Sequence, residues 1–400
     1  MTSKARNHGE DLRGASRLAI DATRAVTEVV EAMHLTLGGG PDLLGSPLER
    51  PLRVLTAPVY GSIKAVTKLV GAGLELALGQ LAPLLGESTP GPEREALLAA
   101  LNGVVGDHLE ATGNPLSIPM ALRREGHPLE LEPAALRAAL PGAAGRVVVL
   151  VHGSSMADVQ WNRRGHDHGA ALARDLGVAT VYLHYNSGRH ISTNGRDLAE
   201  LLERMVRAWP VPIEQLDLVG HSMGGLVSRS ACHHGEVAAH AWRAKLGRLV
   251  CLGTPHHGAP LERGGHWFEL LLGGHRYSAP LARLGRLRSA GVTDMRFGNV
   301  LDEDWQGRDR FAPHTKDTRT HLPLPSGVAC FALAATTSAT PGPRLLGDGL
   351  VPVDSALGKH RVAARTLRFP VESQRIVYGT GHLELLDRPQ VYEALRGWLG

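Results

Sequence analysis

The chain has few aromatic residues and few cysteines. Phe, Trp and Tyr together make up 4% of its 400 residues, which argues against the aromatic platforms on which single-stranded nucleic acids stack. The three cysteines, Cys232, Cys251 and Cys330, are an odd set without CxxC spacing. We therefore expect small buried side chains in a reducing compartment rather than a disulfide framework.

Long apolar runs and concentrated charge are missing as well. No uninterrupted apolar stretch reaches the roughly 18 residues that a transmembrane helix needs. Residues 1–16 are polar and lack the apolar centre of a secretory signal, so we expect a cytoplasmic protein. The net charge is +4 and Arg is scattered rather than clustered, which predicts no nucleic-acid partner.

The sequence contains no motif that is specific for a metal or a cofactor. It has no HExxH, P-loop or paired Cys/His zinc spacing, and Gly71-Ala72-Gly73 lacks the third glycine of a dinucleotide-binding turn. Two weaker alternatives are His166-Asp167-His168, which could touch a metal, and Glu384 with Asp387, which could hold Ca²⁺. We expect neither a metal nor a cofactor.

The pattern of apolar residues divides the chain into a helical part and an α/β part. We expect disorder in residues 1–16 and a helical module in residues 17–115, whose last helix follows Pro92. Packing of this module on the rest of the chain is the favoured interpretation, and peripheral contact with a membrane surface is the alternative. Residues 118–400 alternate strands and helices, which predicts a mainly parallel central sheet with helices on both faces.

One long segment of the α/β part, residues 258–325, has no clear strand pattern. Connections of this length inside a compact domain are often lids or binding loops, so we predict a cap insertion. Its apolar residues, with Trp267 and Phe268 among them, are candidates for the lining of an apolar pocket. A loosely ordered surface insertion is the alternative.

The most informative motif is the pentapeptide Gly220-His221-Ser222-Met223-Gly224, which has the pattern G-x-S-x-G. It follows the apolar run 216–219 and precedes the helix-compatible segment 225–229. A strand, a sharp turn and a helix are the setting of a nucleophile elbow, whose serine sits in strained backbone between glycines. The motif therefore predicts Ser222 as a nucleophile.

A serine hydroxyl needs a base to accept its proton, and in this arrangement the base comes last in the chain. The predicted strand 375–378 leads into Gly379-Thr380-Gly381-His382, so His382 follows the carboxyl end of a strand. Parallel strands bring these ends to one edge of the sheet, where the elbow also lies. We predict His382 as the base, with His256 and His257 as the alternatives.

The base is in turn oriented by an acid, which should lie between the elbow and the histidine in the sequence. Asp348 stands between two glycines in the loop after the predicted strand 328–334, and those glycines allow a close approach. We predict Asp348 as the acid. Asp354 is the alternative, and the weaker candidates that precede this strand are Asp294 and Asp302.

The tetrahedral intermediate of acyl transfer carries an oxyanion that needs two fixed N–H donors. Met223 should provide one, because it follows the nucleophile at the start of a helix. The other should be the backbone N–H of Ser154, in the loop after the first central strand. We expect His152 and Gly153 to shape this loop and to line the substrate pocket.

Taken together, four segments resemble the lipase-like branch of the α/β-hydrolase superfamily. The elbow segment also resembles that of the GPI inositol-deacylase group. The matching segments are Val151-His152-Gly153, residues 218–227, Gly253-Thr254-Pro255-His256-His257-Gly258 and Asp348-Gly349-Leu350-Val351-Pro352. The resemblance covers about residues 118–400. It implies an α/β-hydrolase fold and hydrolysis of carboxylic esters through an acyl-enzyme, with Ser222, Asp348 and His382 as the catalytic triad.

The expected function is therefore that of a serine esterase or lipase acting on an apolar acyl ester, either a small molecule or a lipid. Acyl transfer to an alcohol other than water is an alternative that would use the same triad. A hydrolase-fold protein that binds a ligand without catalysis is the other. The chain departs from secreted lipases in lacking a signal peptide and an evident disulfide pair, and in its added N-terminal helices.

Overall fold

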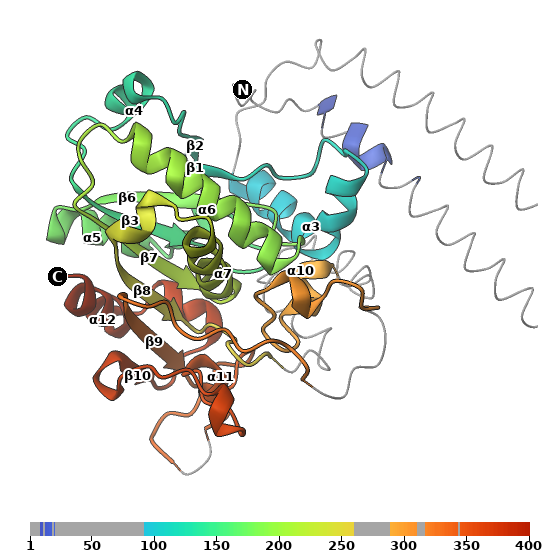
Figure 1. The fold of residues 1–400 in the computed structure, drawn as a ribbon, viewed down its shortest axis with the longest axis vertical. Helices are drawn as coiled ribbons and strands as arrows, with labels where there is room; N and C mark the ends of the chain where they lie inside the picture. The colour runs from blue at the N-terminus through green and yellow to red at the C-terminus, as the bar shows by residue number, and fades with distance from the viewer. Residues whose placement is uncertain are drawn as a thin grey trace, which may run out of the picture. The chain divides into compact units, whose positions relative to one another are not determined.

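The computed structural model describes residues 9–10, 13–17, 20, 92–259, 289–309, 317–342 and 345–400 (Figure 1). Trp267 and Phe268, most of the predicted cap and most of the N-terminal module lie outside these residues. Residues 9, 10 and 13–17 are helical, although the sequence led us to expect disorder up to residue 16. The chain forms two compact units, one of residues 1–90 and 109–117, the other of residues 91–108 and 118–400.

An eight-stranded sheet forms the centre of the larger unit, in the order β2-β1-β6-β3-β7-β8-β9-β10 (Figure 1). Each pair of neighbours in the part β6-β3-β7-β8-β9-β10 is parallel, whereas β1 is antiparallel to both β2 and β6. The strands are β1 (Ala121–Arg124), β2 (His127–Pro128), β3 (Arg146–Val151), β6 (Ala179–His184), β7 (Gln215–His221), β8 (Leu246–Leu252), β9 (Ala329–Ala335) and β10 (Gln374–Val377). The short strands β4 (Asn162–Arg163) and β5 (His166–Asp167) form a separate hairpin.

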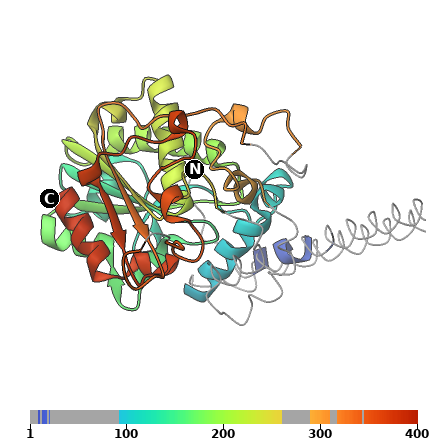
Figure 2. The same ribbon diagram turned by 90° about the horizontal axis from the view of Figure 1, so that it is seen from below.

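Helices cover both faces of this sheet (Figure 2). The helices α6 (Ile191–Ala208) and α7 (Met223–Val237) pack on each other, as do α5 (His168–Leu176) and α12 (Pro389–Leu399). Val148 and Leu150 of β3 belong to the same buried cluster as residues of α5 and α12. Since successive side chains of a strand point to opposite faces, the other residues of β3 face the opposite side. Burial on both faces explains the unbroken apolar run of this strand.

The remaining helices lie in the connections between these elements. They are α3 (Pro92–Ala111), α4 (Pro133–Ala139), α10 (Ala290–Asp294) and α11 (Val353–Ala356), with the 3-10 helices η3 (Asp158–Trp161), η4 (Ala241–Lys245), η6 (Asp302–Asp304), η7 (Ala363–Arg365), η8 (Val371–Ser373) and η9 (His382–Leu386). Among the helices of the described residues, none is both long enough and apolar enough to cross a membrane. The mainly parallel sheet with helices on both faces is the predicted α/β-hydrolase fold.

The three cysteines lie in the centre of this fold. Cys232 is on α7, Cys251 on β8 and Cys330 on β9, and all three are buried and free, as the sequence predicted. Burial raises the pKa of each thiol to about 12. The thiols therefore stay protonated and serve as small apolar side chains.

The helix α3 differs from the expected domain organisation. The sequence placed it at the end of the module 17–115, but residues 91–108, which include most of α3, group with the sheet. Amphipathic spacing shows that a helix has a face to bury and leaves open which part of the chain covers that face. The contacts of α3, given below, explain the grouping.

Candidate active site

Ser222 lies between the end of β7 and the start of α7, at φ 54° and ψ −123°. Backbone of this kind is strained for a residue with a side chain and persists only where the surroundings enforce it. A Cβ atom on Gly220 would lie 2.4 Å from the Gly225 nitrogen, and one on Gly224 would lie 2.2 Å from the Val151 oxygen. Both obstacles are backbone atoms, so only glycine fits at these two positions, as expected for a nucleophile elbow.

His382 begins η9, directly after β10, and is held by Asp348. Its Nδ1 lies 2.7 Å from Asp348 Oδ2, and its backbone N–H donates to the Asp348 carbonyl at 3.0 Å. The other carboxylate oxygen, Oδ1, accepts hydrogen bonds from the backbone N–H groups of Leu350 (2.9 Å) and Val351 (2.8 Å). Because a carboxylate accepts at Nδ1, the neutral imidazole leaves the lone pair on Nε2 free to take a proton.

Ser222 follows β7 and His382 follows β10, so both lie at the carboxyl edge of the parallel strands, with β8 and β9 between them. The backbone N–H of Ser222 donates to the Leu252 carbonyl at 2.8 Å. A Cβ on the next residue, Gly253, would lie 3.3 Å from both Asp348 Oδ2 and His382 Cε1. Among the described residues, neither Ser222 Oγ nor His382 Nε2 has a hydrogen-bond partner, although both atoms are buried. Ser222 therefore lies at the same edge of the sheet as the His382–Asp348 pair, and no hydrogen bond joins Ser222 Oγ to His382 Nε2.

His221 lies beside this group and fixes the backbone of the histidine. Its Nε2–H donates to the His382 carbonyl at 3.2 Å, and the centroids of the two rings are 4.8 Å apart. Burial, together with the neighbouring His382, holds the pKa of His221 well below its ordinary value. His221 is therefore a neutral hydrogen-bond donor that helps to set the position of His382.

The loop after β3 contacts the serine from the other side. A Cβ on Gly153 would lie 3.0 Å from the Ser222 Cβ. The loop is held by the backbone N–H of Ser155, which has φ 58° and donates to Ser187 Oγ at 2.9 Å. Among the described residues, no hydrogen bond uses the backbone N–H of Ser154 or that of Met223 at the start of α7. Both predicted oxyanion donors are free to bind a ligand.

His152 lies beneath this loop and is fully buried. Its Nδ1 is 2.8 Å from the Gly153 carbonyl, and its ring stacks on Tyr185 at 4.3 Å between centroids. The Tyr185 hydroxyl donates to the His152 carbonyl at 2.9 Å. Burial lowers the pKa of His152 to about 3, so the ring is neutral. These contacts are those of a residue that shapes the loop.

The alternative bases have other partners. His256 Nδ1 lies 3.4 Å from an Arg229 nitrogen, and His257 Nε2–H donates to the Gly358 carbonyl at 2.8 Å. Burial lowers the pKa of His256 strongly and that of His257 to about 4. Asp348 contacts His382 and neither of these residues.

The alternative acids are also engaged elsewhere or exposed. Asp354 is exposed on α11. Asp294 Oδ2 accepts from the backbone N–H of Ile191 and lies 2.9 Å from His190 Nδ1, while Asp302 forms an ion pair with Arg196. Asp348 is therefore the carboxylate that orients His382.

The suggested metal sites are occupied by the protein's own groups. His166 Nε2 lies 2.8 Å from His168 Nδ1, and His168 Nε2–H donates to the Leu385 carbonyl at 2.9 Å. Glu384 is 3.0 Å from an Arg388 nitrogen, and Asp387 lies 3.4 Å from Arg163. Arginine charge at these carboxylates opposes the binding of Ca²⁺.

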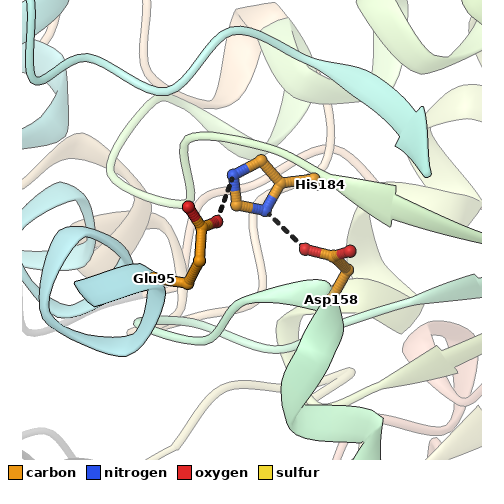
Figure 3. A group of neighbouring side chains, drawn as sticks. All are labelled: Glu95, Asp158 and His184. Carbon is orange, nitrogen blue, oxygen red and sulfur yellow. Dashed lines mark ion pairs between the residues drawn. The ribbon is translucent and has the colours of Figure 1, made fainter. Parts of the chain in front are cut away.

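A buried ionic cluster that the sequence did not reveal joins α3 to the sheet. Figure 3 shows Glu95 of α3, Asp158 of η3 and His184 of β6 as neighbouring side chains. One possible ligand atom from each lies within 4.8 Å of the others. Arg123 already occupies the two carboxylates, at 2.8 Å from Glu95 Oε2 and 3.2 Å from Asp158 Oδ1. A guanidinium at these oxygens leaves no place for a cation. Burial acts to raise the pKa of Asp158, but His184 and Arg123 outweigh it and lower the pKa.

The same helix supports the loop beside Ser222. A Cβ on Gly103 would lie 1.9 Å from Ser155 Oγ and 2.8 Å from its Cα, so α3 touches the loop at a glycine. The Asn186 side chain donates to the Gly106 carbonyl at 2.8 Å, and the Ser289 hydroxyl donates to the Gly103 carbonyl at 2.6 Å. The helix that we had placed in the N-terminal module therefore holds the loop of Ser154 in position.

Comparison with known proteins gives a partial family match and several distant structures. A family model described as Domain of unknown function (DUF7379) matches residues 123–291. A search of curated proteins found no match. Similar solved structures include the mature lipase BlEst2 of Bacillus licheniformis, at 17% identity and a TM-score of 0.42 over 70% of this chain and 98% of that chain.

Two further structures are similarly distant. A thermophilic esterase from Thermogutta terrifontis has 14% identity and a TM-score of 0.36, over 70% of this chain and 93% of that chain. A hydrolase from Pseudomonas aeruginosa has 16% identity and a TM-score of 0.35, over 71% and 95% of the two chains. The fold of the present chain is assigned from its own strand order and elbow.

Proposed function

We propose that this protein is a serine hydrolase that cleaves carboxylic esters, with Ser222 as nucleophile, His382 as general base and acid, and Asp348 as the group that orients the imidazole. One observation carries the proposal. A buried serine with strained backbone has an unpartnered hydroxyl, and it shares the carboxyl edge of the sheet with a histidine whose Nδ1 is held at 2.7 Å by a buried carboxylate. This is the arrangement that acyl transfer through a serine requires.

The reaction proceeds in two halves. Ser222 Oγ attacks the ester carbonyl while His382 Nε2 accepts its proton, and the backbone N–H groups of Met223 and Ser154 stabilise the oxyanion. The intermediate collapses as His382 returns the proton to the leaving alcohol, which leaves an acyl-Ser222. Water, deprotonated by His382, then attacks the acyl carbon. The bond between the acyl carbon and Ser222 Oγ breaks, His382 returns the proton to Ser222 Oγ, and the carboxylic acid leaves.

The substrate class is proposed from the sequence motifs. Four segments have the character of lipase-like enzymes, and the elbow segment resembles that of the GPI inositol-deacylase group. We therefore propose esters with an apolar acyl chain as substrates. Residues of the predicted cap, Trp267 and Phe268 among them, are candidates for contact with that chain.

A fluorophosphonate probe tests the proposed function directly. We expect stoichiometric labelling of the full chain, with the adduct on the peptide that contains Ser222, because the probe traps an activated serine. The measurement is intact mass followed by peptide mapping. Prior incubation with a slowly hydrolysed apolar ester should reduce the labelling rate. Absence of an adduct, or an adduct on another serine, would contradict the assignment and favour a non-catalytic binding protein.

The substitution Asp348→Asn tests whether Asp348, rather than Asp354, is the acid that orients His382. An amide in place of the carboxylate favours the wrong imidazole tautomer, so we expect kcat to fall by about 10⁴-fold. Asp354→Asn is the matched control, since Asp354 is an exposed aspartate in the same segment, and its kcat should stay within about twofold. The check is the hydrolysis of a p-nitrophenyl ester by both variants. Equal losses would contradict the assignment of Asp348.

A further inference from the structure

A second concave site in the larger unit is rich in positive charge. Arginines and histidines dominate its lining, and the site is partly open to solvent. The lining residues are Arg229, His256, His257, Gly298, Val300, Arg319, Thr320, His321, Leu322, Arg365 and Leu367. None of the residues proposed for catalysis belongs to this set. We refer to this site as the arginine pocket.

Arg229 carries a buried charge in the arginine pocket. The residue is 4% exposed, and its guanidinium donates to the Leu322 carbonyl and to His256 Nδ1, the latter at 3.4 Å. Among the described residues, no carboxylate forms an ion pair with Arg229, and its Nε–H is buried without a partner. Burial lowers the pKa of Arg229 to about 10, which still leaves the group charged at neutral pH. An uncompensated buried charge is costly unless an anion binds to it.

His256, another residue of the lining, carries a second unpaired donor. A guanidinium can only donate, so His256 Nδ1 accepts from Arg229 and the neutral ring carries its hydrogen on Nε2. That Nε2 is fully buried and, within the described part of the chain, has no partner. Both ring nitrogens of His257, in contrast, have partners. Arg319 donates to its Nδ1, and its Nε2–H donates to the Gly358 carbonyl. Two buried N–H groups, on Arg229 and His256, therefore lack an acceptor.

The charges around the arginine pocket do not balance. Arg319 Nε and Arg365 lie 3.2 Å and 2.8 Å from the same Asp317 oxygen, so these two guanidiniums share one carboxylate. His360 is 3.8 Å from that oxygen as well. Asp304, behind the lining, accepts from the backbone N–H groups of Val300, Leu301 and Thr320. Arg229 is the guanidinium that these carboxylates leave uncompensated.

We propose that the arginine pocket binds the oxyanion of a phosphate group. Guanidinium and imidazole N–H groups are well suited to phosphate oxygens. The donors come from α7, from the segment after β8, from residues 319–322 and from η7, so they approach from several directions. A tetrahedral oxyanion can use such donors better than a planar carboxylate, which one guanidinium alone can saturate.

Isothermal titration calorimetry with inorganic phosphate tests the proposal on the full chain. At pH 7, and against sodium chloride of equal ionic strength, we expect saturable binding of one phosphate per chain. Arg229→Met should weaken this binding by at least about tenfold, which corresponds to about 1.4 kcal/mol. Arg365→Gln should weaken it as well, and Arg365, with a side chain 26% exposed, can be replaced with little risk to the fold.

Arg243→Gln provides the matched control. Arg243 has a side chain 11% exposed, pairs with Glu236 and lies outside the arginine pocket, so this variant should bind phosphate as the wild type does. The proposal is overturned if the wild type binds no phosphate. It is also overturned if Arg229→Met and Arg365→Gln bind phosphate with unchanged affinity.

The phosphate could be a free ion or part of a substrate, and inhibition of hydrolysis distinguishes the two sources. This comparison rests on the proposed function, whereas the calorimetry does not. Phosphate that competes with a soluble short-chain phospholipid but leaves a neutral ester unaffected indicates that a phosphorylated substrate uses the arginine pocket. Phosphate that binds in the calorimeter without changing either reaction indicates a free ion as the ligand.

Discussion

Replacement of Ser222 by alanine is expected to lower kcat for p-nitrophenyl esters by at least about 10⁵-fold, down to a residual rate from oxyanion stabilisation and binding. The variant loses the atom that forms the acyl bond and keeps the rest of the site. Its fold should persist, because Ser222 Oγ makes no hydrogen bond to any described residue whose loss would destabilise it. The measurement is initial rates corrected for background hydrolysis, with circular dichroism to establish folding.

Ser228→Ala is the control for this experiment. Ser228 is likewise buried but lies within α7, and its hydroxyl donates to the Gly224 carbonyl at 2.8 Å. Loss of that hydrogen bond should change the free energy of unfolding by about 1 kcal/mol and leave kcat within a few-fold. If Ser222→Ala retained the wild-type kcat with the protein folded, the elbow serine would not be the nucleophile.

Deletion of residues 1–115 is expected to abolish folding of the larger unit, whereas deletion of residues 1–90 should spare it. The longer deletion removes Glu95, and loss of one partner from a buried ion pair costs about 3–5 kcal/mol. It also removes Leu98 and Val104, each worth about 1.5–3 kcal/mol when buried, and Asn102, which accepts from the Ile118 N–H. The sum is comparable to the total stability of a typical domain, about 5–15 kcal/mol.

Thermal unfolding and hydrolysis of a soluble ester check this prediction in both truncated chains. The shorter deletion should keep a cooperative transition and most of the activity, and the longer one should lose both. A single substitution tests the contact between α3 and the loop of Ser155 without removing any part of the chain. Gly103→Ala places a Cβ 1.9 Å from Ser155 Oγ and should lower the Tm, while Gly397→Ala, in open space on α12, should not. A stable, active protein without residues 1–115 would refute the role given to α3.

The nucleophile elbow could be predicted from the sequence because its structural requirements fall on residues that are close together in the chain. The strain at Ser222 and the close approach of Gly220 to Gly225 involve neighbours in one strand–turn–helix segment, so they leave a short motif in the sequence. His382 could be placed because it follows a strand. The sequence could not choose between Asp348 and Asp354 by geometry, since the choice depends on side-chain direction. In the structure Asp348 is buried, and its Oδ1 accepts hydrogen bonds from the backbone N–H groups of Leu350 and Val351.

The parts that the sequence did not reveal depend on long-range contacts. Glu95 has the position of an acidic residue in the first turn of a helix, where it would favour the helix dipole. Its partner Arg123 lies 28 residues away and the carboxylate of Asp158 farther still, so no local pattern connects them. The arginine pocket likewise combines α7 with segments about a hundred residues away in the sequence. Arg229 by itself has the character of an ordinary polar residue on a helix.

The buried thiols on α7, β8 and β9 make the folded molecule inert to alkylating reagents, because only an accessible thiolate reacts at a useful rate. They lie on two neighbouring strands and on the helix α7, which packs on β8, so reagent should reach them only when these elements separate. The rate at which these thiols are alkylated should therefore report how often the larger unit unfolds. Uptake of iodoacetamide would distinguish a variant that has merely lost its chemistry from one whose interior has come apart.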